Sequence, residues 1–100
     1  AFQGVISIMK ILRMPAVLDM TGYRSPASIY SAIHDGTFPK QVRIGARSVG
    51  WPYDEVEVIT GARIGGATDA QLRQLVAVIH IKRDELGIHI AKQFQKGLQQ

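Results

Sequence analysis

Hydrophobic residues recur at helical spacing in two short segments near the start of the chain. The first runs from about Pro15 to Met20 and ends at Thr21-Gly22, where glycine tolerates a left-handed backbone. In the second, Ser25 suits an N-cap and Pro26 the first helical position, and Gly36 ends the helix. Its apolar positions are Ile29, Tyr30 and Ile33. The pattern therefore predicts two short helices joined by a tight turn.

A change of period after Phe38-Pro39 predicts a small β-hairpin. Residues 41–44 alternate polar and apolar side chains, as in a half-buried strand that turns Arg43 outward. The positions expected to face inward are Val42 and Ile44. Residues 45–48 are typical of a turn, and residues 49–51 return along the hairpin.

Two further helices are expected after the hairpin. Asp54 is expected to cap a third helix that closes near Gly61, with apolar positions at Val56, Val58 and Ile59. Gly65-Gly66 then forms a linker, and Thr68 with Gln71 forms a capping box at the start of a long helix. Gly87 is a candidate kink in that helix, at a cost of about 1 kcal/mol.

The long helix carries one apolar stripe with spacings of three, four or seven residues. Its members are Leu72, Leu75, Val76, Ile79, Leu86, Ile90 and Phe94. The stripe either packs back on the preceding domain or pairs with a second copy. Pairing is favoured, because a domain ending near Gly65 would need little further cover and about 30 helical residues span some 45 Å. A homodimer or higher homo-oligomer is therefore expected.

Composition narrows the class of protein. A chain of 100 residues that is 46% hydrophobic forms one small core. It contains no cysteine, which excludes disulfides, thiolate zinc sites and a cysteine nucleophile, and favours a reducing, cytoplasmic setting. Its apolar runs are too short to span a membrane. We expect residues 1–8 to be a tag remnant or flexible N-terminus, followed by a domain over 9–64, a linker over 65–67 and the long helix over 68–98.

The basic charge is concentrated around the predicted hairpin. The net charge of +4 and the pI near 9.8 favour a polyanionic partner, and residues 10–51 carry six basic against two acidic side chains. The order of helix, turn, helix and basic hairpin indicates a winged helix-turn-helix that binds double-stranded DNA. The expected contacts to DNA are Arg24, Ser25, Ser28, Tyr30, Ser31, Lys40, Arg43, Arg47 and Ser48.

These candidates differ in the kind of contact they offer. The basic side chains suit phosphate, and Arg47 at the hairpin tip also suits a narrow minor groove. Ser25, Ser28 and Ser31 lie three residues apart and are expected on nearly one face of the second helix, either reading bases weakly or simply solvated. Tyr30 suits either a phosphate contact or the core.

The chain resembles the AlpA family of prophage regulators over residues 10–64. The residues that carry the resemblance are Ile29-Tyr30, Gly36, Phe38-Pro39, Val42, Ile44-Gly45, Arg47 and Gly50-Trp51. The resemblance implies a mainly α fold with a small β-hairpin, a second helix in the major groove and the Arg47 turn against the minor groove or phosphates. Ser31 stands where an arginine commonly follows the tyrosine.

Two kinds of activity other than transcriptional regulation by site occupancy stay open. The family resemblance also implies excisionase-like members, which bend or coat DNA for a recombinase, whereas a regulator recruits or excludes RNA polymerase. The winged fold could instead bind a protein partner without DNA.

Catalysis and metal binding are not expected. The histidines at 34, 80 and 89 lack a metal-site spacing, and no nucleophile motif is present. No cofactor is expected, because Ala67 stands where a phosphate-binding loop needs lysine.

Overall fold

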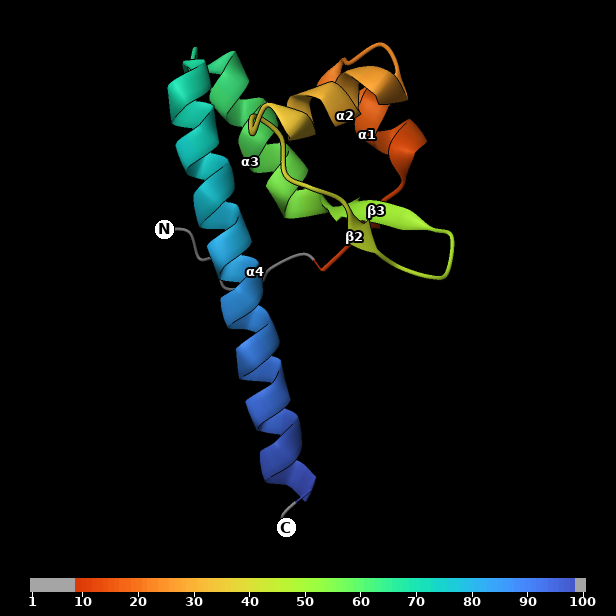
Figure 1. The fold of residues 1–100 in the computed structure, drawn as a ribbon, viewed down its shortest axis with the longest axis vertical. Helices are drawn as coiled ribbons and strands as arrows, with labels where there is room; N and C mark the ends of the chain where they lie inside the picture. The colour runs from red at the N-terminus through yellow and green to blue at the C-terminus, as the bar shows by residue number, and fades with distance from the viewer. Residues whose placement is uncertain (1–8, 99–100) are drawn as a thin grey trace.

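The computed structural model describes residues 9–98, so the expectation for residues 1–8 lies outside the described residues. The elements are β1 (Ile11–Leu12), α1 (Met14–Thr21), α2 (Pro26–His34), β2 (Val42–Arg43), β3 (Val49–Pro52), α3 (Tyr53–Ile64) and α4 (Asp69–Leu98). Helices α1, α2 and α3 cluster beside a small sheet, and α4 runs along α3 and continues far past the sheet (Figure 1). The fold is the expected winged helix-turn-helix with a long C-terminal helix.

Local signals in the sequence set both helices of the helix-turn-helix. The α1 helix ends at Gly22, whose φ of 82° is left-handed and whose N–H donates to Leu18 O at 2.9 Å. The α2 helix begins after Ser25, whose Oγ accepts the Ser28 N–H at 3.3 Å, and Pro26 occupies its first turn. Both predicted boundaries are confirmed.

The sheet contains a strand that the alternation did not predict. Strand β3 is central and pairs antiparallel with β1 on one side and β2 on the other. Both residues of β1, Ile11 and Leu12, are apolar, so no alternation marks this strand. At Gly50 in β3, any Cβ would collide with the Ile11 side chain and lie 2.8 Å from Leu12 O. Glycine is therefore required by the close approach of β1.

Two details of the hairpin and of α3 differ from expectation. The Ile44 side chain is exposed rather than inward, because β2 ends at Arg43 and the alternation ends with it. Asp54 does not cap α3: the helix follows β3 directly from Tyr53, and the Asp54 carboxylate accepts only the adjacent Glu55 N–H at 3.0 Å.

Two further differences from the sequence-based expectation concern the C-terminal end of α3 and one of its faces. The helix continues through Gly61 to Ile64, because Gly61 keeps a helical backbone and the left-handed glycine that follows the helix is Gly66, with a φ of 89°. Val58 is exposed, whereas Val56 and Ile59 are buried as expected. The spacing of three between the buried pair defines the inner face.

The core is completed by α4. Trp51, Phe38 and Ile29 are almost fully buried, and the Trp51 indole N–H donates to Pro39 O at 2.9 Å. The α4 residues buried in the same cluster are Leu72, Val76 and Ile79. The expectation that the winged domain needs little further cover is wrong, because its small sheet and three short helices leave one side open.

The long helix itself begins as expected and does not break. The Thr68 N–H donates to Gln71 Oε1 at 2.9 Å and the Gln71 N–H donates to Thr68 Oγ1 at 3.1 Å, which is the predicted capping box. The α4 helix is continuous through Gly87. Within residues 9–98, no helix combines the length and apolar character needed to cross a membrane.

Candidate nucleic-acid interface

The outward face of α2 differs from the serine face expected from the sequence. Ile29 and Ala32 are the buried residues of α2, and at 100° per residue the opposite side carries Ala27, Ser31 and His34. All three of these side chains are exposed. The serine face was expected opposite Ile29 and Ile33, the two residues predicted to be the inner residues of this helix. In the structure Ala32 is buried beside Ile29, and Ile33 is only half-buried. Ala27 and His34 were missed for that reason.

The first two serines are engaged within the protein. The Ser25 hydroxyl serves as the cap of α2 and lies 3.3 Å from the Ser28 hydroxyl, and both side chains are half-buried. Ser28 and Ser31 border a shallow hollow whose other polar lining residues are Asp35, Thr37, Arg63 and Asp69. Because carboxylates repel phosphate, Asp35 and Asp69 make this side of α2 a poor one for a nucleic-acid backbone.

Tyr30 connects α2 to the sheet. Its ring centroid lies 6.2 Å from that of Trp51, yet 40% of the residue is exposed. The sequence left open whether Tyr30 packs in the core or faces outward, and the structure shows both. The residue borders the outward face of α2 on the side nearest to the hairpin.

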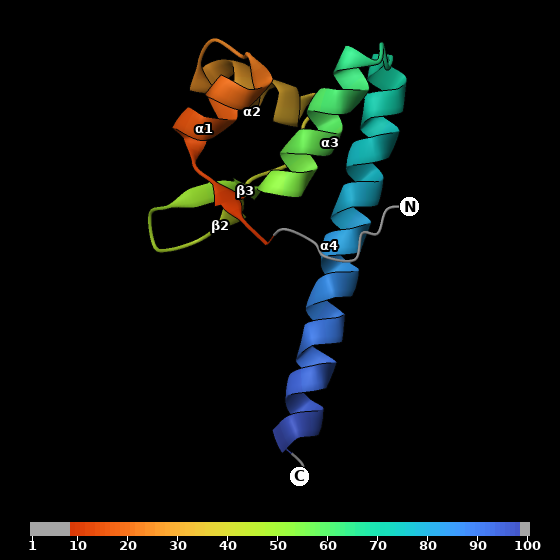
Figure 2. The ribbon, with the colours of Figure 1, turned by 180° about the vertical axis from the view of Figure 1, so that it is seen from behind.

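The hairpin of β2 and β3 is the wing. The Ile44 N–H donates to Ser48 O at 2.9 Å, and an Arg43 guanidinium nitrogen donates to Ala46 O at 3.4 Å. These bonds order the turn and leave Arg47 exposed. The wing and α2 lie on the same side of the molecule, away from α4, in both views (Figures 1 and 2). Arg24 is also exposed, in the turn before α2.

Lys40 is held by its backbone between α2 and the wing. Its N–H donates to His80 Nε2 at 3.2 Å, and its carbonyl accepts from Arg83 Nη2 at 2.7 Å. Arg83 also pairs with Glu55, with nitrogen to oxygen distances of 2.6 and 2.9 Å. At the end of α2, the carbonyl oxygen of Asp35 accepts a hydrogen bond from Arg73 Nε at 2.9 Å. Three side chains of α4 therefore bind the backbone of the segment that joins α2 to the wing, and sequence spacing gave no signal of these contacts.

The environment of His80 favours the neutral form of its imidazole by lowering its pKa. Partial burial lowers the pKa of His80, and the positive charges of Arg83 and Lys40 lower it further, against the opposing charges of Glu55 and Asp84. The neutral ring is the form whose nitrogen can accept the Lys40 N–H.

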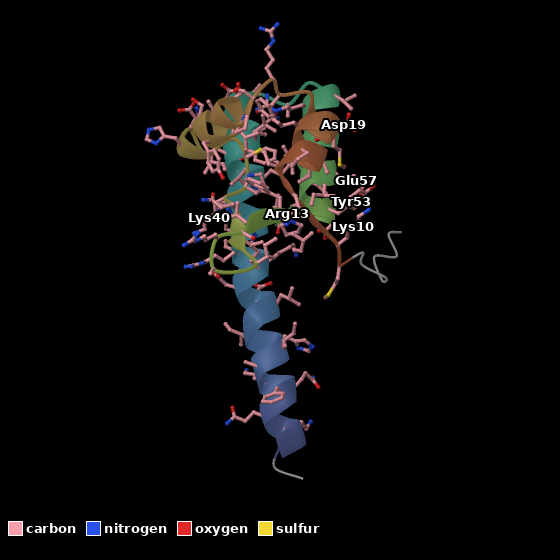
Figure 3. All side chains as sticks on the ribbon, turned by 90° about the vertical axis from the view of Figure 1, so that its right-hand side faces the viewer. Lys10, Arg13, Asp19, Lys40, Tyr53 and Glu57 are labelled. Carbon is pink, nitrogen blue, oxygen red and sulfur yellow. The ribbon has the colours of Figure 1, made fainter. Side chains whose placement is uncertain are left out.

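Charge is divided between two sides of the winged domain. Figure 3 shows Lys40 on the side of the wing and α2, whereas Asp19 and Glu57 lie on the side of α1 and α3. Lys10 is on that acidic side, where its Nζ lies 5.7 Å from the centroid of the Tyr53 ring. The exposed cations around α2 and the wing include Arg24, Lys40, Arg43 and Arg47. Across residues 9–98, no cluster of three or more metal-ligating side chains occurs.

Comparison with known proteins decides the family. The family model of the prophage CP4-57 regulatory protein (AlpA) matches residues 10–59, which span β1 to most of α3. The chain belongs to the AlpA family. This AlpA match ends before α4, so the long helix and its contacts lie outside the part of the chain that the family defines.

Two relatives each align with the chain over 57 residues. The chain is 39% identical over 57 residues to the uncharacterized protein ORF88 of Enterobacteria phage P4, covering 57% of this chain and 64% of that protein. It is 42% identical over 57 residues to the DNA-binding transcriptional activator AlpA of Escherichia coli K12, covering 51% of this chain and 80% of that protein. No solved structure matches the chain significantly.

Proposed function

We propose that this AlpA-family protein is a sequence-specific DNA-binding transcription regulator that acts by occupying its site. The observation that carries the proposal is the exposed face of α2 beside an arginine-tipped wing, on the side of the molecule away from α4. A relative named as a DNA-binding transcriptional activator supports it. The resemblance to a phage protein supports a phage or prophage setting.

In the proposed complex, α2 enters the major groove and the wing reaches the neighbouring minor groove or its phosphates. Ser31 and His34 are then the side chains of α2 that meet base edges. Arg24, Lys40 and Arg43 contact phosphate, and Arg47 contacts phosphate or enters the minor groove. Asp35 and Asp69 keep the other flank of α2 away from the backbone.

The readout of bases in this complex is weak, because neither Ser31 nor His34 gives the paired hydrogen bonds that arginine or asparagine gives, worth about 1 to 3 kcal/mol per base. Most of the affinity then comes from phosphates and falls steeply with salt. Recruitment or exclusion of RNA polymerase, or bending of DNA for a recombinase, follows from where the bound site lies. The protein itself performs no covalent chemistry.

Fluorescence anisotropy tests the proposal with the duplex upstream of the protein's own coding region and a scrambled duplex, each at several salt concentrations. We expect tighter binding to the native duplex. Replacing Arg47 or Arg24 with alanine should weaken binding to both duplexes and lower the salt slope by about one each.

The matched control is Lys92→Ala, which removes one exposed charge from α4 and should change neither value. His34→Ala and Ser31→Ala should instead reduce the preference for the native duplex. Cooperative loading along repeated sites would favour an excisionase, whereas no binding even at low salt would overturn DNA binding in favour of a protein-interaction module.

A further inference from the structure

The second half of α4 exposes an apolar stripe. Leu86, Ile90 and Phe94 are 46%, 51% and 69% exposed. They follow Ile79 at intervals of seven, four and four residues, so they lie on the same helix face as the buried Leu72, Val76 and Ile79. Among residues 69–97 of α4, Arg83 is the last that is not exposed, so the winged domain covers this face only about that far. Figure 2 shows the C-terminal part of α4 continuing alone past the winged domain.

An apolar groove lies where α4 leaves the winged domain. Its apolar lining comes from Met9, Ile11, Val42, Pro52 and Leu86, and its volume is about 460 Å³. Met9 and Ile11 are exposed residues of the chain next to and within β1. The groove and the stripe share Leu86 and therefore form one continuous apolar surface, which we call the α4 surface.

We infer that a second copy of this chain covers the α4 surface, with the two distal helix halves packed antiparallel. Phe94 of each copy inserts into the groove beside the partner's Leu86. Ile90 is the midpoint between residues 86 and 94, so it meets the partner's Ile90 on the two-fold axis. The inserting Phe94 and the groove that receives it lie on the same surface of each copy, which is the self-complementarity that a two-fold interface requires.

The order of charges along α4 favours the antiparallel direction. Asp84 precedes the exposed stripe and Lys96 lies at its end, both on the flanks of the helix, whereas Glu85 and Lys92 lie on the face opposite the stripe. In an antiparallel pair with Ile90 at the centre, Asp84 lies level with the partner's Lys96. A parallel pair would instead gather Asp84 of both copies at one end of the pair and Lys96 of both copies at the other, which is the less favourable distribution of charge.

The apolar area is suited to pairing. With aromatic and large aliphatic side chains of about 150–250 Å², the half-exposed members of the α4 surface present on the order of 400 Å² per copy. That is comparable to the largest apolar patch of a typical monomer, roughly 300–600 Å², which is often functional. When the polar atoms along four helical turns are included, the surface area buried by the two copies together approaches about 1,200 Å², the lower end of the range for specific interfaces.

The pairing would fix the distance between two winged domains, a consequence that rests on the proposed DNA binding. Val76 packs against the winged domain and lies 14 residues before Ile90. At 1.5 Å per residue, the two Val76 positions are then roughly 40 Å apart along the helix pair. One turn of B-DNA spans about 34–36 Å, so the pair is of the size needed to reach two half-sites.

Cysteine cross-linking tests the arrangement directly, because the natural sequence contains no cysteine. Under mild oxidation and without DNA, we expect Ile90→Cys to form a disulfide-linked dimer with itself. Leu86→Cys and Phe94→Cys should not cross-link alone but should cross-link when the two variants are mixed. The matched control is Ile88→Cys, which is 57% exposed on the opposite face of α4 and should stay monomeric on non-reducing gels.

Sedimentation equilibrium supplies the second measurement. Phe94→Lys should raise the dimer dissociation constant by about tenfold or more, since it places a charge in the apolar groove, and Ile88→Lys should leave it unchanged. A monomer at all concentrations overturns the inference. Self-cross-linking of Leu86→Cys and of Phe94→Cys, each alone, overturns the antiparallel arrangement. Because no DNA is present, neither result depends on whether the protein binds DNA.

Discussion

The two halves of α4 share one apolar spacing but lie in opposite surroundings. In the first half, Leu72, Val76 and Ile79 are buried against the winged domain, and Arg73, His80 and Arg83 bind the loop before the wing. In the second half, Leu86, Ile90 and Phe94 continue the same stripe and are exposed. Periodicity shows which face of a helix is apolar. Contacts elsewhere in the fold decide what that face touches.

The largest expected effect is a difference in unfolding free energy between substitutions in the two halves of α4. In a Phe94→Lys background, studied at a concentration below the dimer dissociation constant, Leu72→Ala should lower the free energy of unfolding by about 2–5 kcal/mol, because it leaves a cavity in the core. Leu86→Ala should change it by less than about 0.5 kcal/mol. Urea denaturation followed by circular dichroism measures both. Equal losses would mean that the distal stripe is also packed within the monomer.

A second variant tests how the first half of α4 is held. Glu55→Gln should cost about 1.5–3 kcal/mol, because it removes the charged hydrogen bonds to the largely buried Arg83 guanidinium. Glu57→Gln removes the same charge two residues later, where the carboxylate is exposed and accepts only the Tyr53 hydroxyl at 3.5 Å. Thermal unfolding should distinguish the two. If they are equally stable, the pair with Arg83 contributes nothing to folding.

A third variant addresses β1, which lies inside the region matched by the family. Gly50→Ala should destabilise the protein by about 1–3 kcal/mol, since the new methyl group meets the Leu12 backbone and the Ile11 side chain. Gly45→Ala is the control, because a Cβ there meets only Ser48 at 3.8 Å. Chemical denaturation would contradict the close packing of β1 if both variants matched the natural chain.

The smallest expected effect is a dependence of stability on pH. The folded protein lowers the pKa of His80 below its ordinary value of about 6.5, so between these two values the unfolded chain binds more protons. Stability is therefore fully present above about pH 6.5 and declines as pH falls through the folded pKa. Protonation also removes the acceptor for the Lys40 N–H.

The measurement is the difference between the natural chain and His80→Gln in thermal unfolding from pH 8 to pH 5. The variant should lack the part of the slope that falls below about pH 6.5. An identical pH profile for the two proteins would show that His80 does not contribute.

Much of the winged domain could be predicted because its signals are local. Gly22 ends α1 and Ser25 caps α2 through backbone geometry and bonds within a few residues. The capping box at Thr68 has the same character. Such features depend on neighbours in sequence, so the amino-acid order is sufficient to place them.

The candidate interface was predicted less completely. Arg24 and Arg47 are exposed on a turn and a hairpin, as expected. The prediction that Ser25, Ser28 and Ser31 form the outward face of α2 was wrong for the first two. Whether Ile33 or Ala32 is the inner residue of α2 depends on what packs against the helix. That choice shifts the outward face to Ala27, Ser31 and His34. Asp35 and Asp69 meet beside α2 only in the folded chain.

By itself, the sequence determined the helix-turn-helix, the arginine-tipped wing, the family and the apolar stripe of α4, since each depends on periodicity, caps or short spacing. Tertiary structure alone decided that half of the stripe completes the core, that β1 joins the sheet and that Arg83 links α4 to Glu55 and Lys40. The hydrogen bonds of Arg83 reach Glu55 and Lys40, which lie 28 and 43 positions away from it in the sequence. Contacts at such separations depend on how whole elements pack, and no local pattern encodes them.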